Sequence, residues 1–527
     1  MLPATRAPRL VRAARTCTLP AARGPRRASS TLRPPTPPST SRPSVKHVGG
    51  SPLSNRIPPV ASTSSSLATP SMPSAAPSRP SPSELLTVLE ETIKTHGPLP
   101  VPRYMSLCLN HPTLGYYTTR TVFGKEGDFV TSPEISQVFG ELLAIWYVTQ
   151  WLAQGSPMRV RVVELGPGRG TLLADILRTF RALPPHSRPP VSSIHLVEQS
   201  DQLKAVQKAR LVETGFADTP VEWHADVKGV PDASDEFTIL IAHEFFDALP
   251  IHIFENTQKG WREVLVDIAD PKAIVASSAT HSPLRLVLAP GATPASALYT
   301  SLAQAAFSGV LERGHLQPDL NSAAAPVVKS PLTLNVDTTL GYAAPAPVPG
   351  PATEAVVGAG SLTAQRFARL PIGSRIEVSP ASWEVARDVA RLVGGGGAGG
   401  AGLVVDYGDG KAFGRSWRGF RKHQVVDPLT EPGHTDLTAN VDFSYVAEAM
   451  GEFGDTHGPL TQSRFLTALG LQPRLAALIR GAASEERRRE IESAAKRLVD
   501  GNGMGSQYKV LALTPKGATG VFPFDLE

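Results

Sequence analysis

The segment that most constrains the fold is a predicted strand, a glycine-rich turn and a predicted helix in direct succession. Apolar residues dominate Arg161 to Leu165, the turn reads Gly-Pro-Gly-Arg-Gly, and a helical pattern runs from Thr171 to Ile176. Glycine lets a backbone turn sharply and approach a ligand closely, and the start of a helix presents unpaired N–H groups. The segment therefore predicts a ligand-binding turn at the carboxyl edge of a sheet.

Short apolar strands alternate with longer helical stretches around this turn, which predicts a parallel sheet with crossover helices on both faces. The first predicted strands are residues 161–165, 194–198, 221–225, 237–242 and 264–268. An Ala-, Pro-, Ser- and Gly-rich stretch then predicts an inserted, partly disordered segment at 271–360. Beyond it the sequence predicts a strand at 376–378, a helix ending near Val393, a flexible glycine loop at 394–402, and strands at 403–407 and 508–513.

The spacing of the glycines distinguishes two kinds of cofactor site. A dinucleotide-binding turn needs its third glycine three positions after the second, where this chain has Thr171. Gly166, Gly168 and Gly170 instead follow the every-second-residue pattern of S-adenosyl-L-methionine sites. The turn therefore predicts S-adenosyl-L-methionine as the cofactor.

Carboxylates stand at the ends of three predicted strands. Glu164, two residues before the first glycine, fits the ammonium of the cofactor's amino-acid end. Glu198 is placed to accept both ribose hydroxyls, and Asp226 is placed for the adenine amino group. Any one such acid is more often a solvated strand end, but three at a shared edge indicate a binding site.

The N-terminal region has no acidic residue before Glu84, whereas it carries twelve Lys or Arg residues. This Arg-rich, Ser-rich composition is typical of a mitochondrial transit peptide, which we expect at residues 1–30, followed by a disordered linker at 31–83. A disordered basic tail on a cytosolic or nuclear protein is the alternative. Ser83 is expected to cap the first helix of a mainly helical region, 84–158.

Charge and composition exclude several classes of protein. The formal net charge is +5 (52 minus 47), and without the twelve basic residues before Glu84 it becomes 40 minus 47, or −7. A mildly acidic folded part argues against a nucleic-acid-binding protein. No apolar run reaches the roughly twenty residues that span a bilayer, so stable membrane insertion is not expected. Two cysteines, Cys17 and Cys108, exclude a multi-cysteine zinc site.

Longer motifs in this chain resemble those of a known protein family. The resemblance runs from about residue 84 to the C-terminus, outside the insertion. They are GDFVTSPEIS at 127–136, ELGPGRGTL at 164–172, HEFFDALP at 243–250, IEVSPAS at 376–382, VVDYG at 404–408, PGHTDLTANVDF at 432–443 and GPLTQSRFL at 458–466. With these motifs the chain resembles the MidA-like protein arginine methyltransferases, a family that assists the assembly of respiratory complex I.

The resemblance implies an α/β fold with a seven-stranded, Rossmann-like class I methyltransferase core and a helical N-terminal extension. The cofactor-binding core would occupy residues 159–270, and residues 361–527 would supply the remaining fold and the substrate region. The resemblance further implies an arginine of a core complex I subunit as substrate, in the mitochondrial matrix, and suggests symmetric dimethylation. The family varies at the position of His243, so we expect no essential role for it.

Glu244 and Asp247, three residues apart after the fourth predicted strand, are the candidate catalytic residues. A guanidinium is a poor nucleophile with a pKa of about 12.5 or more, and paired carboxylates can localise its charge and accept its proton. The alternative is that Glu244 caps the next helix and Asp247 is exposed. The pairing is by analogy, because known arginine methyltransferases carry their glutamate pair at a wider spacing.

The loop at 127–136 contains two hydroxyl residues, Thr131 and Ser132, that we expect to lie over the cofactor as part of a lid. The alternative is a capping box, with Ser132 as N-cap of a helix beginning near Glu134. The thirteen histidines have no metal-ligand spacing, His195 and His224 are more often structural than catalytic, and no metal is expected.

Two other functions remain open at this point. One is a small-molecule methyltransferase, for example in quinone synthesis, because a cofactor core does not reveal the substrate. The other is an assembly factor that keeps a cofactor pocket without turnover, although the intact glycine turn gives it no support.

Overall fold

The computed structural model describes residues 83–119, 131–232, 235–270, 282–301 and 362–526. The expected transit peptide, nearly all of the linker, residues 127–130 of the expected lid and most of the expected insertion lie outside these ranges. All described residues belong to one compact unit, Arg79–Glu527. Among them, no helix has both the length and the apolar character needed to cross a membrane.

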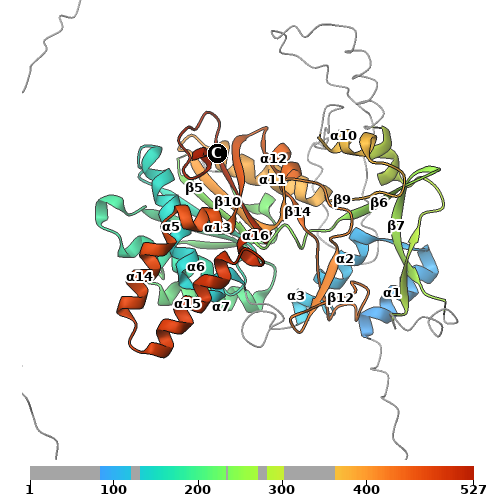
Figure 1. Cartoon of the computed structure of the whole chain (residues 1–527), viewed down its shortest axis with the longest axis horizontal. Helices are drawn as coiled ribbons and strands as arrows, with labels where there is room; N and C mark the ends of the chain where they lie inside the picture. Colours follow the sequence, from blue (N-terminus) through green and yellow to red (C-terminus); the bar gives the residue numbers. More distant parts are fainter. Residues whose placement is uncertain (1–82, 120–130, 233–234, 271–281, 302–361, 527) are drawn as a thin grey trace, which may run out of the picture. The chain divides into compact units, whose positions relative to one another are not determined.

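The main sheet has the strand order β15-β16-β10-β5-β2-β3-β4, and a short strand, β14, pairs with β10. Figure 1 labels β5, β10 and β14 of this sheet. The strands from β10 to β4 are parallel, whereas β16 and β15 are antiparallel to their neighbours. The predicted methyltransferase core has seven strands, and the short strand β14 is an eighth strand in the observed sheet. The bounds are β2 Val160–Leu165, β3 Val191–Val197, β4 Val221–His224, β5 Phe237–His243, β10 Gly400–Asp409, β14 Val441–Asp442, β15 Gly454–Thr461 and β16 Tyr508–Pro515.

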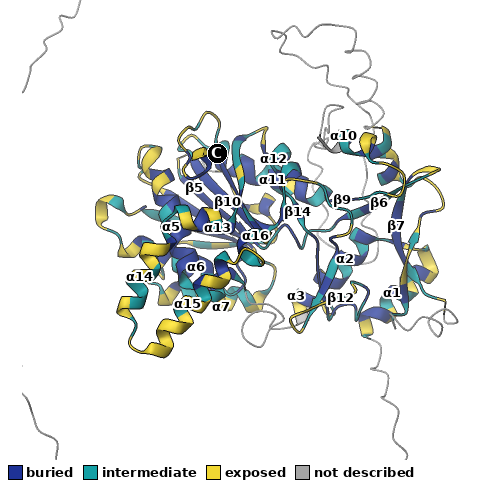
Figure 2. Ribbon diagram, in the orientation of Figure 1, coloured by how far each residue is buried: buried dark blue, intermediate teal, exposed yellow. Residues whose placement is uncertain are grey.

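Apolar side chains alternate between the two faces of this sheet, and helices cover each face. On β2, Val160 and Val162 pack with α5, α6 and α13, whereas Val163 and Leu165 pack with α11 and α12. In Figure 2 the strands are correspondingly buried, while α14 and α15 are largely exposed. The bounds are α5 Gln137–Ala153, α6 Thr171–Ala182, α7 Asp201–Glu213, α11 Pro380–Gly394, α12 Phe443–Met450, α13 Gln462–Ala468, α14 Leu471–Gly481, α15 Glu485–Val499 and α16 Met504–Gln507.

A second, antiparallel sheet has the order β1-β7-β6-β9, with β8 also paired to β7. The predicted strand at 264–268 lies in β7 of this sheet, so its assignment to the parallel sheet was wrong. Helices α1 and α2 pack their apolar residues against β6 and β7. The bounds are α1 Glu84–His96, β1 Leu99–Pro100, α2 Val101–Asn110, β6 His252–Thr257, β7 Gly260–Ile268, β8 Leu284–Leu288 and β9 Arg375–Val378.

Ser83 caps α1, as predicted, because its hydroxyl accepts a hydrogen bond from the backbone N–H of Leu86. The remaining elements are short. They are α3 Tyr116–Thr119, α4 Ser132–Ile135, η1 Pro185–Ser187, η2 Val227–Gly229, η3 Phe524–Leu526 and a three-stranded sheet of β11 Arg418–Arg421, β12 Gln424–Val426 and β13 Asp436–Thr438.

Part of the expected insertion belongs to the ordered fold. Residues 284–288 form β8, and residues 294–301 are helical. Tyr299 in that helix stacks on Phe367 of α10, Leu362–Arg369, with ring centroids 5.1 Å apart. Residues 284–288 and 294–301 of the predicted insertion are thus ordered, and a strand of five residues is easily hidden in an Ala- and Pro-rich sequence.

The glycine run at 394–402 is mostly not the flexible loop that was expected. α11 extends to Gly394 and β10 already begins at Gly400, so the connection is short. A Cβ at Gly400 would lie 2.8 Å from the carbonyl oxygen of Val393. Glycine is needed there because the helix end packs closely against the start of the strand.

Candidate active site

A cavity of about 480 Å³ opens at the carboxyl ends of β2, β3, β4 and β5. This volume is typical of small-molecule sites, which occupy about 300–1,000 Å³. Most of the predicted site residues line the cavity, namely Thr131, Glu164, Gly166, Gly168, Glu198, Asp226, Glu244 and Asp247. Gly170 and Ser132 do not line it. Residues far apart in the sequence thus converge on one site.

The glycine turn between β2 and α6 contains three positive φ angles, 61° at Gly166, 51° at Gly168 and 73° at Gly170. Residues with a Cβ rarely adopt this conformation. At Gly166 an added Cβ would also lie 3.0 Å from the ring of Phe245. Gly170 is the N-cap of α6, and a Cβ there would contact Gln207 at 3.6 Å. The turn therefore requires glycine for its conformation and, at Gly166, for space.

Glu164 is buried on β2 and faces the cavity. Burial raises its pKa to about 8. Among the described residues, none donates a hydrogen bond to its Oε2 atom. A buried polar atom without a partner is costly, and a cationic group in the cavity would satisfy it.

Glu198 follows β3 and is held in place by two hydrogen bonds. Its Oε1 accepts from the backbone N–H of Ser200 at 2.8 Å, and its Oε2 accepts from Gln207 Nε2 at 3.2 Å. Gln207 Nε2 also donates to the carbonyl oxygen of Gly168 at 2.7 Å, and Trp223 Nε1 donates to Gln207 Oε1. Gln207 thus connects the glycine turn with Glu198, a role that sequence reasoning missed.

Asp226 lies on the exposed rim of the cavity, beyond the end of β4. Its Oδ1 accepts a hydrogen bond from the backbone N–H of Gly229 at 3.0 Å and so caps the 3₁₀ turn η2. Asp226 thus lines the cavity and also caps a turn.

The turn after β5 begins with a strained residue. Glu244 has φ 49°, which is uncommon for a residue other than glycine and costs about 1–3 kcal/mol. Asp406 at the end of β10 holds this turn, because its Oδ2 accepts from the backbone N–H groups of Phe245, Phe246 and Asp247 at 3.2, 3.0 and 3.3 Å. Sequence reasoning missed Asp406, although it stands in the VVDYG motif within the predicted strand 403–407.

Glu244 and Asp247 both line the cavity; Asp247 is buried, which excludes the alternative of an exposed Asp247, and the side chain of Glu244 is 11% exposed. Tyr508 on β16 donates to Glu244 Oε1 at 2.8 Å. Thr438 on β13 donates to Asp247 Oδ2 at 2.6 Å, while no described residue donates to Asp247 Oδ1. Each acid thus has one oxygen held by a hydroxyl group.

Burial and mutual repulsion raise the pKa of the acids in this cluster. Burial, followed by the charge of Asp247, raises the pKa of Glu244 to about 8. Burial also raises the pKa of Asp247, and burial together with the charge of Asp247 raises that of Asp406. A cation that enters the cluster would favour the ionised carboxylates. Burial lowers the pKa of the neighbouring His243 to about 3, so its ring is neutral at physiological pH.

Some described residues of the expected lid line the cavity, and one is buried in the core. Thr131, Pro133 and Glu134 line the cavity, whereas Ser132 is fully buried with its hydroxyl 3.4 Å from Gln462 Oε1. Ser132, predicted as a cofactor contact, therefore does not reach the cavity in this structure. It is not the cap of α4 either, because Thr131 occupies the N-cap position.

Asp436 completes the acidic wall of the cavity. It lies on β13, and its Oδ1 accepts a hydrogen bond from the hydroxyl of Tyr117 at 2.9 Å. Tyr407 and Phe245 contribute aromatic walls beside Asp247. The cavity thus places acidic groups between aromatic surfaces, a combination suited to a planar cation.

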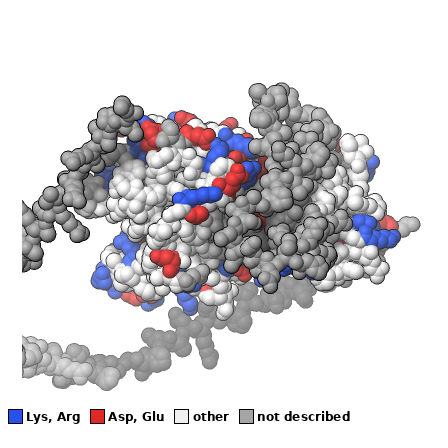
Figure 3. Space-filling model, turned by 90° about the horizontal axis from the view of Figure 1, so that it is seen from above, with Lys and Arg blue, Asp and Glu red and all other residues white. Residues whose placement is uncertain are grey.

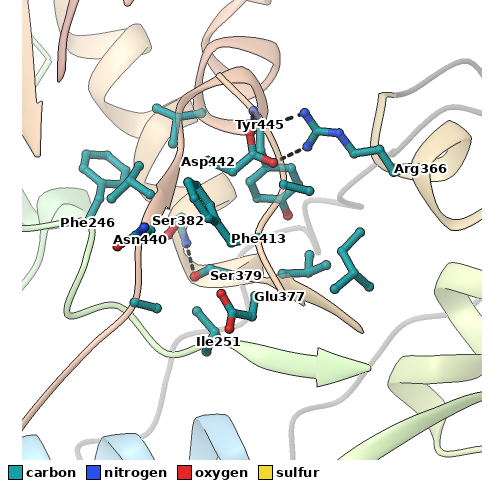
Figure 4. Close-up of a pocket in the computed structure, with 16 residues that line it drawn as sticks. Phe246, Ile251, Arg366, Glu377, Ser379, Ser382, Phe413, Asn440, Asp442 and Tyr445 are labelled. Carbon is teal, nitrogen blue, oxygen red and sulfur yellow. Dashed lines mark hydrogen bonds and ion pairs between the residues drawn. The ribbon is translucent and has the colours of Figure 1, made fainter. Parts of the chain in front are cut away.

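A second cavity lies behind the Glu244 turn, and Figure 4 shows its lining. Phe246 forms one side of it, Ser379 and Glu377 another, and Arg366 pairs with Asp442 at its edge. Its volume of about 40 Å³ has room for water but not for a cofactor. We therefore assign it to the packing of the turn.

The visible surface carries charges of both signs. On the face in Figure 3, acidic and basic side chains of the described residues lie in small mixed groups. The charged groups seen on this face are mixed in sign, unlike the extended single-sign field that nucleic-acid binding uses.

The chain matches a family model described as "Putative S-adenosyl-L-methionine-dependent methyltransferase" over residues 142–328 and 343–459. It is 34% identical over 449 residues to protein arginine methyltransferase NDUFAF7, mitochondrial, of Mus musculus, which covers 82% of this chain and 84% of that protein. The Homo sapiens protein of the same name is 33% identical, with 82% and 83% covered. The Drosophila melanogaster homolog is also 33% identical, with 81% and 84% covered.

Two solved structures are similar to this chain in fold. A Burkholderia thailandensis protein bound to S-adenosyl-homocysteine has a TM-score of 0.57 and 23% identity, covering 82% of this chain and 91% of that protein. A native crystal structure from the same organism has a TM-score of 0.56 and 22% identity. These two structures and this chain are therefore similar in fold.

Proposed function

The chain belongs to the family of S-adenosyl-L-methionine-dependent protein arginine methyltransferases that includes NDUFAF7, and we propose that it dimethylates an arginine of a core complex I subunit in the mitochondrial matrix. The enzyme class and the cofactor follow from the family. The substrate, the symmetric dimethylation and the matrix are our proposal. The family resemblance of the sequence and the mitochondrial names of the relatives support it.

The cavity residues fit S-adenosyl-L-methionine, which when bound supplies an electrophilic methyl group on a sulfonium. The carboxylate of Glu164 would hold the ammonium through its unpartnered Oε2 atom. Glu198, already oriented by Ser200 and Gln207, would accept the ribose hydroxyls. Asp226 on the rim would accept from the adenine amino group, and Gly166 and Gly168 would let the backbone come close.

Glu244 and Asp247 are the proposed clamp for the substrate guanidinium. Both carboxyl groups line the cavity that Glu164 also lines, and Asp247 Oδ1 has no described donor. A guanidinium presents several N–H donors in one plane, so two carboxylates can bind it from one side. This convergence of partly unsatisfied carboxyls with the glycine turn is the observation that carries the proposal.

Glu244 is the proposed proton acceptor. As a methyl group bonds to a guanidinium nitrogen, that nitrogen must lose a proton to return the product to a single positive charge. Tyr508 holds Oε1 of Glu244, which orients the carboxylate. A pKa of about 8 in the buried site makes Glu244 a stronger base than an exposed glutamate.

Glu244→Gln keeps the shape of the side chain and removes its charge. We expect S-adenosyl-L-methionine to bind within a few-fold of wild type, while methyl transfer falls by roughly two or more orders of magnitude. Glu486→Gln, on the exposed face of α15, is the matched control and should leave both unchanged. Tritiated methyl transfer to extract from mitochondria that lack the protein measures the rate.

The same assay separates the alternatives. Label in a protein band, identified as dimethylarginine by mass spectrometry of complex I subunits, supports the proposal. Label in the organic extract would indicate a small-molecule methyltransferase, and restoration of complex I by Glu244→Gln without any label would indicate a non-catalytic assembly factor. Near-normal turnover by Glu244→Gln would contradict the clamp.

The proposed location predicts that residues 1 to about 30 are removed on import. N-terminal sequencing of the protein from purified mitochondria measures this. Recovery of an intact Met1, or recovery only from cytosol, would contradict the proposed location.

A further inference from the structure

Three potential metal ligands meet on one face of the main sheet. His195 lies on β3, and Glu222 and His224 lie on β4. In the parallel register His195 is paired with Glu222, and His224 is two residues further along β4. Residues two apart on a strand point to the same face, so the register gathers all three side chains.

The distances suit a single ion. His195 Nδ1 lies 3.1 Å from His224 Nε2 and 3.9 Å from Glu222 Oε2, and the three ligand atoms all lie within 4.8 Å of one another. Two nitrogens that bind one zinc ion at about 2.0–2.1 Å lie about 3.3 Å apart in a tetrahedral site. The histidine separation is therefore close to that of a shared metal, although an N–H···N hydrogen bond also fits it.

We propose that His195, Glu222 and His224 form a binding site for a divalent transition-metal ion of the zinc type. Imidazole nitrogen together with one carboxylate is a ligand set suited to Zn²⁺, and Mg²⁺ prefers oxygen alone. Three protein ligands leave a fourth position for water. The site goes beyond the proposed methyl transfer and takes no part in it.

Burial and charge around the three ligands support a cation. The side chain of His195 is 6% exposed and that of Glu222 is 62% exposed, so the site extends from the sheet to solvent and an ion can enter. The exposed Glu222 can rotate to shorten its distance. Glu222 and Glu236 place negative charge near His195, against the positive charge of Arg161, and Glu236 is itself paired with Arg159.

The position of the site gives the metal a structural role. β4 is the last strand of the sheet and pairs only with β3 among the described strands. An ion bound to both strands would fix this edge. Glu198 follows His195 by three residues and Asp226 follows His224 by two, so the fixed edge carries two proposed cofactor contacts.

Zinc binding to the chelator-treated full-length protein tests the proposal. We expect one equivalent of Zn²⁺ in native mass spectrometry and a rise in melting temperature with Zn²⁺ but not with Mg²⁺. His224→Gln should weaken zinc binding at least about tenfold, since even residues that only support a metal ligand cost about 10–100-fold when changed. Glu222→Gln should weaken it several-fold.

Two variants are matched controls. His186→Gln, on the exposed turn η1, and Glu213→Gln, at the exposed end of α7, should bind zinc as the wild type does. Circular dichroism checks that His224→Gln folds, and Glu222→Gln tests the site through an exposed residue. Absence of zinc binding by the wild type, or equal binding by wild type, His224→Gln and Glu222→Gln, would leave a hydrogen-bonded histidine pair only and overturn the proposal.

Discussion

One oxygen of Asp406 accepts three backbone N–H groups of the turn that carries the proposed clamp. Its other oxygen accepts from the backbone N–H of Tyr407 at 2.9 Å. An asparagine can keep one oxygen acceptor, but its amide nitrogen cannot accept the remaining N–H. Both oxygens of the side chain are therefore needed as acceptors.

We predict that Asp406→Asn lowers methyl transfer by about tenfold or more, while S-adenosyl-L-methionine affinity stays within a few-fold. The reason is that an unsatisfied N–H costs about 1–3 kcal/mol and loosens the turn between Glu244 and Asp247. Single-turnover kinetics and calorimetry measure the two effects. Asp409→Asn, three residues further along β10, is the control. Loss of cofactor binding instead of turnover would show that Asp406 supports the glycine turn.

Glu164 predicts a pH dependence of cofactor binding. Its pKa of about 8 lies above the ordinary 4.5, so the folded protein without ligand carries a neutral Glu164 at pH 6. Binding an ammonium requires the ionised form, and each pH unit below the pKa weakens binding by up to about tenfold. Affinity should therefore rise with pH between 6 and 7.5, accompanied by release of a proton.

Calorimetry in buffers of different ionisation enthalpy measures both affinity and proton release. Glu164→Gln should bind the cofactor more weakly and lose most of the pH dependence, whereas Glu213→Gln should behave as the wild type. Equal pH dependence in wild type and Glu164→Gln would show that another group titrates.

Among single residues, the sequence predicts those site residues that stand next to the end of a predicted strand. Glu164, Glu198 and Glu244 line the cavity because parallel strands bring their carboxyl ends together. Asp406 and Tyr508 were missed because their roles depend on β10 lying beside β5 and β16 lying beside β10. No local pattern encodes those neighbours.

At the scale of elements, the glycine turn and α6 act as one unit. We predict that Gly170→Val weakens S-adenosyl-L-methionine binding by more than tenfold, because a branched residue at φ 73° would move the turn and its contact with Gln207. Gly260→Val is the matched control, since Gly260 has φ 86° with open space around it and lies in the β6–β7 hairpin.

Both variants should lower the melting temperature, but only Gly170→Val should lose cofactor binding. Calorimetric titration of each folded variant distinguishes the two effects. Equal loss of affinity in both would indicate general destabilisation.

The elements that sequence predicted well are those with local signals. The predicted strand–turn–helix at 161–176 corresponds to β2 and the start of α6. The strand at 264–268 was found but assigned to the wrong sheet, because an isolated apolar strand does not say which neighbour it pairs with. β8 was missed since three of its five residues, Arg285, Leu286 and Leu288, are exposed and its flanks are rich in Ala, Pro and Ser.

For the whole molecule, the boundary of the insertion can be tested by deletion. Deleting residues 306–357 leaves β8, the helical residues 294–301 and α10 in place, so cofactor affinity should stay within a few-fold. A second, longer deletion, of residues 285–345, removes β8 and the stacking of Tyr299 on Phe367. We predict a lower melting temperature for the longer deletion, by several degrees or more. Scanning calorimetry measures this, and equal melting temperatures would show that β8 contributes nothing.

The strand that enters the main sheet last in sequence does not lie at its edge. β16 is inserted between β10 and β15, and it delivers Tyr508 to Glu244. A chain that is threaded N-terminus first, through a ribosomal exit tunnel or an import channel, cannot complete its sheet until about its last twenty residues have arrived. A product truncated near residue 500 would therefore contain the whole glycine turn but would lack a complete sheet. It would also lack the hydrogen bond from Tyr508 to Glu244, so we expect activity only once the C-terminal strand is present.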